Sequence, residues 1–325
     1  MNIKKLMPLL VIFIILLGLV YVKRSTQEQP TLEAQADLQA LVADVDASAI
    51  RKLELFASAN AEEIVTLEKD GDHWLVKSHF EAPVKSETID TYLENLVAMQ
   101  GEFRATAETD EQLAEYGLKD DQAFRVQGYK SGAEQPIIDL LVGEAPDQRT
   151  VFVREASDKT VYVESTNPRR DAGLMGDDLS EAPTADKWLD KDALTLDKDA
   201  ITKVAVTTPD KAMSFEKRTK EAAPVEPVEG DDAAPAAPPE PEVEWAMVVG
   251  GADKAHKDVA LQNMLNKLKT LTAEDVVDPG TLAEWGLETP GFKSVVTLGE
   301  GEEVIVEGGR PDTSGDGYIR IASND

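Results

Sequence analysis

The chain has 325 residues, no cysteine and a formal net charge of −29 at pH 7. Without cysteine it can form no disulfide bond, thiolate nucleophile, cysteine-linked lipid anchor or Cys/His zinc site. The negative charge repels phosphate backbones, so we expect no nucleic-acid partner. With 42% hydrophobic residues, a chain of this length can bury an ordinary core.

The first predicted element is a membrane-spanning helix, because an apolar run extends from Leu6 to Val22 between pairs of basic residues. Its seventeen residues span roughly 25 Å, the short end of what a hydrocarbon core of about 30 Å requires. A cleaved secretory signal is the alternative, although no A-x-A-like cleavage site follows the run. The residues expected to contact lipid are Leu6, Leu9, Leu10, Ile12, Phe13, Ile14, Leu16, Leu17, Val20 and Tyr21.

An anchor at residues 1–24 predicts a single-pass protein of the inner (cytoplasmic) membrane, with the bulk of the chain outside the cytoplasm. Two basic residues flank the run on each side, so only the N-terminal amine favours this orientation. Residues 25–44 would then form a juxtamembrane segment. The membrane is therefore the first expected partner.

Residues 45–166 are predicted to form a first α+β module. Apolar and polar residues alternate over 49–55, as in a strand, and Asp70-Gly71-Asp72 predicts a hairpin turn before a strand that begins at Trp74. An amphipathic helix follows, with its apolar stripe at Ile89, Leu93, Leu96 and Met99. The remaining predicted strands are 125–129, 137–142, 150–154 and 161–164.

A repeated phrase, LAEYGL at 113–118 and LAEWGL at 282–287, predicts the same helix end twice. A left-handed glycine would end each helix, and the leucines on either side of it would make the apolar contact of a Schellman motif. Tyr116 and Trp285 are expected to pack nearby as apolar anchors. The signature residues are Trp74, Leu113, Tyr116, Gly117, Leu118, Trp245, Leu282, Trp285, Gly286 and Leu287.

Residues 196–325 continue to match the first module, after a connector at 167–195. The predicted strands include 200–206, 215–217, 293–298, 303–307 and 317–321, and the second helical stripe is formed by Leu261, Leu265, Leu268 and Leu271. The first copy continues through a further strand at 161–164, and the chain ends before the second copy can show one. We therefore predict an α+β protein with two tandem duplicated modules, each with antiparallel strands and one amphipathic helix.

An insertion rich in proline, alanine and glutamate, at about 221–243, interrupts the second module between Phe215 and Trp245. It has too few large apolar residues to bury a core, which predicts a disordered hairpin tip. A passive loop is favoured over a docking site, because no basic residue flanks a P-x-x-P motif.

Several of these residues resemble a family pattern: Trp74, Tyr116-Gly117-Leu118, Gly143 and Trp188-Leu189, together with the N-terminal apolar run. The chain resembles the uncharacterised bacterial family called domain of unknown function 4340. Members are often encoded beside ABC-type transport components of the gliding-motility kind, and the resemblance therefore implies an accessory role in a transport or cell-envelope complex. The long insertion departs from the family pattern.

No pattern in the chain predicts a catalytic, cofactor-binding or metal site. His73, His79 and His256 lack metal-ligand spacing, and no nucleophile elbow, Walker loop or dinucleotide fingerprint occurs. Asp312–Gly317 alternates acids and glycines but lacks the register of an EF-hand, so a turn is the better interpretation.

The functional hypothesis is a membrane-anchored, extracytoplasmic scaffold or interaction protein that is not an enzyme. A ligand-binding protein is the alternative, for example one that binds glycans with exposed aromatic residues between the modules. A hydrolase with dispersed acidic residues is less favoured. Burial of Trp74, Tyr116, Trp245 and Trp285 would remove most of the aromatic surface that a glycan needs.

Overall fold

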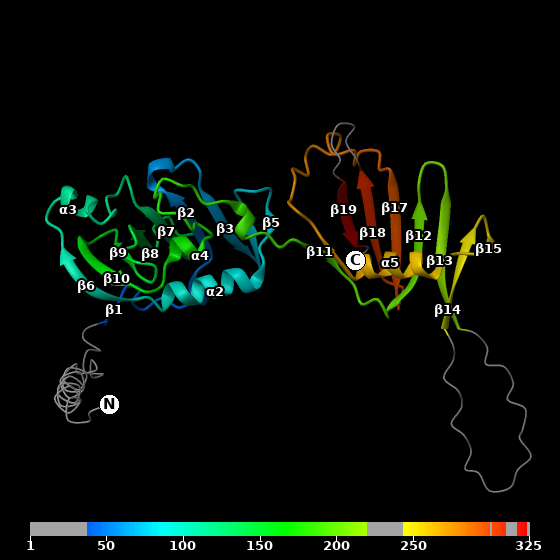
Figure 1. Ribbon diagram of the computed structural model, residues 1–325, viewed down its shortest axis with the longest axis horizontal. Helices are drawn as coiled ribbons and strands as arrows, with labels where there is room; N and C mark the ends of the chain where they lie inside the picture. Colours follow the sequence, from blue (N-terminus) through cyan, green and yellow to red (C-terminus); the bar gives the residue numbers. More distant parts are fainter. Residues whose placement is uncertain (1–37, 220–242, 300, 310–316, 324–325) are drawn as a thin grey trace, which may run out of the picture. The chain divides into compact units, whose positions relative to one another are not determined.

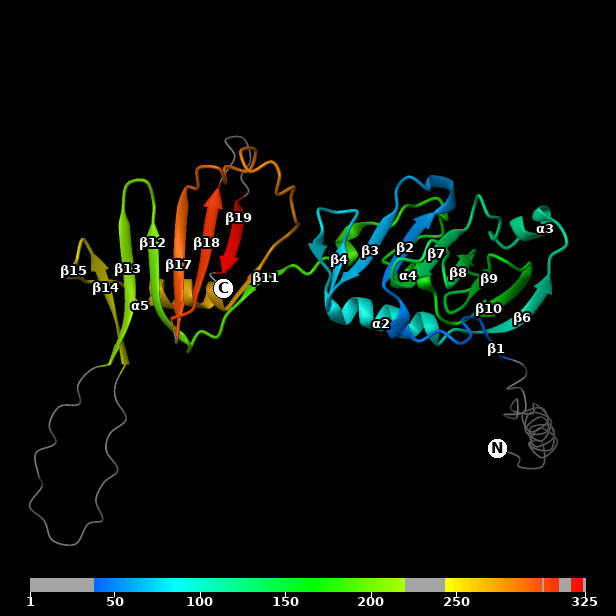
Figure 2. The ribbon, with the colours of Figure 1, turned by 180° about the vertical axis from the view of Figure 1, so that it is seen from behind.

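The computed structural model describes residues 38–219, 243–299, 301–309 and 317–323 (Figures 1 and 2). The chain divides into two compact units, which are described separately. The first comprises Met1–Ile64 and Asp90–Pro183, and the second comprises Val65–Ile89 and Thr184–Asp325. The border between the two units falls inside helix α2 (Ser86–Val97), between residues 89 and 90.

The described part of the chain is mostly β, and its strands form three antiparallel sheets of ten, two and seven strands. The predicted α+β class is therefore wrong. The longest described helices, α2 and α5, have only 12 residues each. Because backbone pairing between strands accounts for most of the regular structure, these helices are additions to a β architecture.

In the first unit, the described strands lie in the order β1-β6-β10-β9-β8-β7-β2. These strands follow from the alternation of apolar and polar residues, because successive side chains of a strand point to opposite faces. On β2, for example, Leu53, Leu55 and Ala57 are fully buried, while the residues between them are partly exposed. The elements are η2 (Ala47–Ala49), η3 (Ser58–Asn60), α3 (Asp110–Ala114), α4 (Pro168–Asp171), β1 (Leu38–Ala40), β2 (Lys52–Ala57), β6 (Gln100–Thr106), β7 (Phe124–Tyr129), β8 (Ile138–Val142), β9 (Val151–Glu155) and β10 (Thr160–Glu164).

In the second unit, β3-β4-β5 pair in sequence, β11 pairs with β16, and seven strands lie in the order β15-β14-β13-β12-β17-β18-β19. The apolar stripe of α5 packs Leu261 and Leu265 into the core beside Val204 and Val296. The elements are η4 (Ala185–Lys187), α5 (Asp258–Lys269), β3 (Val65–Asp70), β4 (His73–Val76), β5 (Ala82–Pro83), β11 (Asp192–Thr195), β12 (Ile201–Thr207), β13 (Ala212–Thr219), β14 (Val243–Val249), β15 (Ala252–Lys254), β16 (Thr270–Thr272), β17 (Phe292–Leu298), β18 (Glu303–Gly309) and β19 (Tyr318–Ser323).

One order of strands occurs in both units. The run β2-β7-β8-β9 of the first unit corresponds to β12-β17-β18-β19 of the second, and β1 pairs with β6 as β11 pairs with β16. In the first unit, β10 lies between β6 and β9 and pairs with both. In the described part of the second unit, no strand joins β16 to β19.

The two copies of the repeated phrase both adopt the predicted left-handed turn. Gly117 has φ of +69°, and the amide of Leu118 donates to the carbonyl of Leu113 at 2.9 Å. Gly286 has φ of +66°, and Leu287 donates to Leu282 at 2.8 Å. In the first copy these bonds form a Schellman motif, which satisfies carbonyl groups at the end of α3. In the second copy residues 282–286 form a turn rather than the predicted helix.

The backbone of the repeated phrase lies against Gly143 and leaves no room for a side chain at this position. A Cβ placed there would be 2.2 Å from the carbonyl oxygen of Tyr116, and the next amide, of Glu144, donates to that same oxygen at 2.9 Å. The end of β8 is thus joined directly to the helix end. Gly309 has the corresponding contact, since a Cβ there would be 2.4 Å from the Trp285 carbonyl oxygen.

The described part of the chain contains no helix that is long and apolar enough to cross a membrane. The described residues therefore give no support to the predicted transmembrane helix or to the single-pass inner-membrane location. The predicted span at 6–22 lies outside the described residues, as do the predicted insertion between Thr219 and Val243 and most of the Asp312–Gly317 turn.

We expect Gly117→Ala to lower stability more than Gly132→Ala does. Both glycines have positive φ, where any Cβ costs about 1–2 kcal/mol. A Cβ at Gly132 meets nothing within 4 Å, whereas one at Gly117 would be 2.6 Å from Leu179 Cδ1. The midpoint of urea unfolding measures the difference, and equal midpoints for the two variants would contradict the close packing at Gly117.

Candidate functional site

The tryptophans and tyrosine of the predicted signature belong to the interior of the units. Trp74 on β4 is buried, and Trp245 on β14 is partly buried against the core of the second unit. Tyr116 and Trp285 are also only partly exposed. Little of this aromatic surface is therefore presented to a ligand.

Each copy of the repeated phrase contributes one ring to an aromatic pair. Tyr116 contacts Phe152 on β9 edge to face, with ring centroids 4.9 Å apart. Trp285 contacts Tyr318 on β19 with centroids 4.7 Å apart. These contacts place Phe152 and Tyr318 at corresponding positions on the two strands.

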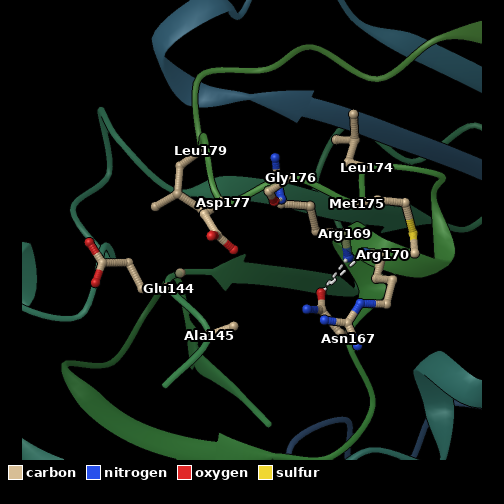
Figure 3. A pocket seen from close by; sticks show the side chains of 11 residues that line it. Glu144, Ala145, Asn167, Arg169, Arg170, Leu174, Met175, Gly176, Asp177 and Leu179 are labelled. Atoms are coloured by element: carbon tan, nitrogen blue, oxygen red, sulfur yellow. Dashed lines mark hydrogen bonds between the residues drawn. The ribbon is translucent and has the colours of Figure 1, made fainter. Parts of the chain in front are cut away.

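A small polar hollow in the first unit surrounds the guanidinium of Arg169, near the start of α4 (Figure 3). Arg169 donates to the carbonyl oxygens of Gly176 and Asp178, and one of its nitrogens lies 3.3 Å from a carboxylate oxygen of Glu181. Asn167 caps α4 by accepting from the amide of Arg169 at 3.1 Å. Arg169 is only 5% exposed, and this burial lowers the pKa of its guanidinium.

The size of this hollow indicates a structural role. Its volume is about 20 Å³, enough for roughly one water molecule. The Nε of Arg169 has no hydrogen-bond partner among the described residues, and a water molecule there would satisfy it. We therefore interpret Arg169 as a clamp on residues 176–181 rather than as a ligand-binding residue.

The candidate functional site is an apolar groove in the second unit, with a volume of about 590 Å³. Helix α5 forms one wall and the sheet forms the floor. Sequence-distant strands contribute to it, including β12, β16, β17, β18 and β19. The lining residues are Val206, Ala260, Asn263, Met264, Lys267, Leu268, Leu271, Phe292, Ser294, Val306 and Ile319.

Strand register explains how the floor of the groove forms. Val206 pairs with Ser294, and Ser294 pairs with Val306, so the three side chains lie in one row on the face toward α5. In the next row, Phe292 pairs with Gly308. A Cβ at Gly308 would lie 1.9 Å from the Phe292 ring, so this glycine provides the space that the ring occupies.

Charge is concentrated on the other face of the sheet. Val306 lines the groove, so the next residue, Glu307, points to the opposite face. Glu307 accepts hydrogen bonds from Arg320, and these bonds lower the pKa of its carboxyl group. Lys293 lies 3.5 Å from the same carboxylate. Lys267 is the one ionisable residue in the lining of the groove. The groove is therefore suited to bind apolar groups.

The described residues contain no group of three or more His, Asp or Glu side chains that could hold a metal ion. His256 packs edge-on against Phe215, and the three histidines do not meet. The lining of the groove contains one serine, Ser294, which is 7% exposed. No histidine is among the lining residues.

No pattern in the sequence predicts the groove. The sequence predicts Leu268 and Leu271 in the core stripe of one helix, but α5 ends at Lys269 and Leu271 lies on β16. Both side chains are only partly buried. Phe292, which is 38% exposed, lay just outside a predicted strand.

The model of the family described as Domain of unknown function (DUF4340) matches residues 74–244, which is more than half of the chain. The chain belongs to this family. No curated protein matches the chain, and no solved structure matches it.

The DUF4340 match extends from Trp74 on β4 to Glu244 on β14. It includes the buried Trp188 and its neighbour Leu189, which forms a β-bridge with Val84. Of the residues that line the groove, only Val206 falls within the match. The groove is therefore a feature of this chain that family membership does not describe.

We expect Arg169→Lys to lower the stability of the protein by about 1–3 kcal/mol, since a lysine cannot bridge the carbonyl oxygens of Gly176 and Asp178. Arg170→Lys is the control, because Arg170 contacts only the exposed carbonyl of Gln148 through its side chain. Urea unfolding compares the two variants. Equal loss of stability would show that Arg169 is not a clamp.

Proposed function

We propose that this DUF4340 protein is a non-enzymatic interaction protein, and that it binds a partner protein through the apolar groove of its second unit. The observation that carries the proposal is the exposed apolar lining between α5 and β19, where Met264, Leu268, Leu271, Phe292 and Ile319 all remain partly exposed. Apolar surface that stays exposed in this way is typical of a binding site.

A protein partner is favoured over a glycan. Sugar binding uses exposed aromatic rings, and Trp74 and Trp188 are buried while Trp245 and Trp285 are packed within the second unit. A protein partner is also favoured over an isolated acyl chain, because the groove opens beside β19, the last strand of its sheet. The backbone groups of such a strand can bind another polypeptide.

The family resemblance provides a setting for this interaction. We propose that the partner is a component of an ABC-type transport or cell-envelope complex, in which this chain is an accessory subunit. The net charge of −29 favours a partner that is not itself strongly acidic.

Site-specific photo-crosslinking in cells tests the proposal. A photoreactive amino acid at position 268, in the groove, should capture one protein partner, whereas the same amino acid at position 259 should not. Val259 is the matched control because it is on the same helix but is 73% exposed and does not line the groove.

Binding of the captured segment provides the quantitative test. A synthetic peptide with the cross-linked sequence should bind the purified protein, and Phe292→Ala should weaken this binding by about tenfold or more, since buried aromatic residues dominate interfaces. Isothermal titration calorimetry measures the affinity. Identical captures at 268 and 259, or capture of a lipid or glycan at 268, would contradict the proposed function.

A further inference from the structure

The outer face of the seven-stranded sheet, opposite α5, carries a row of small and branched side chains. Figures 1 and 2 show α5 along one side of this sheet, and α5 is the one described helix in the core cluster of the sheet. Strand pairing places the members of the row side by side on the other face. From β14 to β19 they are Val248, Ser214, Ala205, Val295, Ile305 and Ala322. We call them the outer row, and all of them are at least partly exposed.

Ion pairs border the outer row on both sides. On one side, Glu307 accepts from Arg320 and lies 3.5 Å from the ammonium group of Lys293. On the other, the carboxylate of Glu216 lies 3.1 Å from the ammonium group of Lys203. The charged side chains on the described strands of this face are four cations and five acids: Lys203, Arg218, Lys293, Arg320, Glu216, Glu244, Asp253, Glu303 and Glu307. The face is therefore close to neutral, although the chain as a whole carries −29.

The corresponding row of the first unit is polar. Glu54 on β2 pairs with Gln127 on β7, which pairs with Asp139 on β8. The run β2-β7-β8 corresponds to β12-β17-β18, and on β2 and β12 alike the residue before the row is fully buried. Gln127 donates to Asp139 at 3.1 Å, and Tyr129 donates to Glu54 at 2.9 Å. Such polar side chains are typical of a sheet face that meets water, whereas the outer row has alanine, valine and isoleucine at the same three positions.

We infer that the outer row is a self-association surface, through which two copies of this chain pack face to face. The two-fold axis of this dimer runs parallel to the strands, between β12 and β17. The inference is independent of the proposed function, because the groove lies on the opposite face of the sheet.

The order of residues along the outer row makes it complementary to itself. The two-fold axis reverses the row, so each branched side chain of one copy meets a small side chain of the other. The three pairs are Val295 with Ala205, Ile305 with Ser214, and Val248 with Ala322. Facing layers pack without voids when large side chains alternate with small ones in this way.

The borders of the outer row are compatible with the same packing. Lys293 meets Thr207 of the second copy, where no charge opposes it. Glu303 meets Glu216, and the salt bridge between Glu216 and Lys203 offsets this repulsion. The ion pairs of each copy therefore remain at the rim of the interface, where polar groups are usual.

The size and charge of the face favour a second copy over a different partner. The sheet has seven strands. With a spacing of about 4.8 Å and a length of about 20 Å, they form a face of roughly 600 Å², so two faces together bury about 1,200 Å². This area is at the lower end of what a specific interface needs. Because its charge is nearly balanced, the face neither repels its own copy nor attracts a strongly charged partner.

The lack of native cysteine allows a direct test by cross-linking. Ala205→Cys in the full chain places one thiol in the middle of the outer row, and a short bis-maleimide should join two such chains. Val259→Cys is the matched control, because Val259 is 73% exposed on α5, which packs on the opposite face. We expect at least about tenfold more cross-linked dimer for position 205 than for position 259, since association raises the effective concentration of the thiols.

A charge placed in the outer row tests its register. Ile305→Lys should raise the dissociation constant of the dimer about tenfold or more, because each lysine would be buried against the second copy without a partner. Adding Ser214→Glu should restore the constant to within about threefold, since the two positions meet across the two-fold axis. Within one copy they do not meet, because β12 and β17 lie between β13 and β18. Sedimentation velocity measures the constant, and urea unfolding checks that each variant is folded.

Several outcomes overturn the inference. Equal cross-linking at positions 205 and 259, or a chain that stays monomeric, would mean that the face does not join two copies. Slow maleimide labelling of the Ala205→Cys variant in a monomeric chain would mean that the chain covers this face itself. Self-association that Ile305→Lys leaves unchanged would place the contact elsewhere, and a folded double variant that does not recover would exclude the two-fold register. Capture of a partner at position 268 tests the groove separately and should persist in Ile305→Lys.

Discussion

Backbone hydrogen bonding between antiparallel strands is the constraint on which this structure depends. The chain has no cysteine, so no disulfide bond reinforces its sheets. A strand inside a sheet has both edges paired, whereas a strand at the end leaves every second amide and carbonyl without a backbone partner. The first unit uses β10 to pair β9 with β6, and the described second unit leaves the corresponding edge of β19 open. The apolar groove on which the proposed interaction rests lies beside β19.

The turn within each copy of the repeated phrase holds the last strands of its unit in place. Gly117 adopts a left-handed conformation that a Cβ would strain, and Gly143 allows the backbone of β8 to approach it closely. The ring of Tyr116 then packs against Phe152 on β9. Two glycines and one aromatic pair therefore connect a local helix end to a distant strand. In the second unit the corresponding glycines and the Trp285–Tyr318 pair connect a turn to β19.

The two hollows of the molecule differ in kind because their linings differ. Arg169 is surrounded by carbonyl oxygens and a carboxylate, which stabilise its charge and leave room for about one water molecule. The groove beneath α5 has an apolar lining with one lysine. Burying the apolar side chains of a partner there would remove both surfaces from water, a gain of about 25 cal/mol for each Å² of apolar area. The first hollow therefore serves the fold, and the second is available for recognition.

Much of the local structure could be predicted from the sequence alone. Alternation at 49–55 predicted a strand, the glycine of LAEYGL predicted a left-handed helix end, and short motifs such as Tyr116-Gly117-Leu118 identified the family. These features depend on neighbouring residues, and so periodicity and turn chemistry reveal them. The fold class was wrong because periodicity detects a helix such as α5 but cannot weigh it against the strand pairing around it. The groove could not be predicted either: Leu271, Phe292 and Ile319 are far apart in the chain, and only the pairing of β17, β18 and β19 brings them together. Local patterns thus determined the elements and their ends, whereas the open edge and its apolar groove were decided by which strands pair across long distances in the sequence.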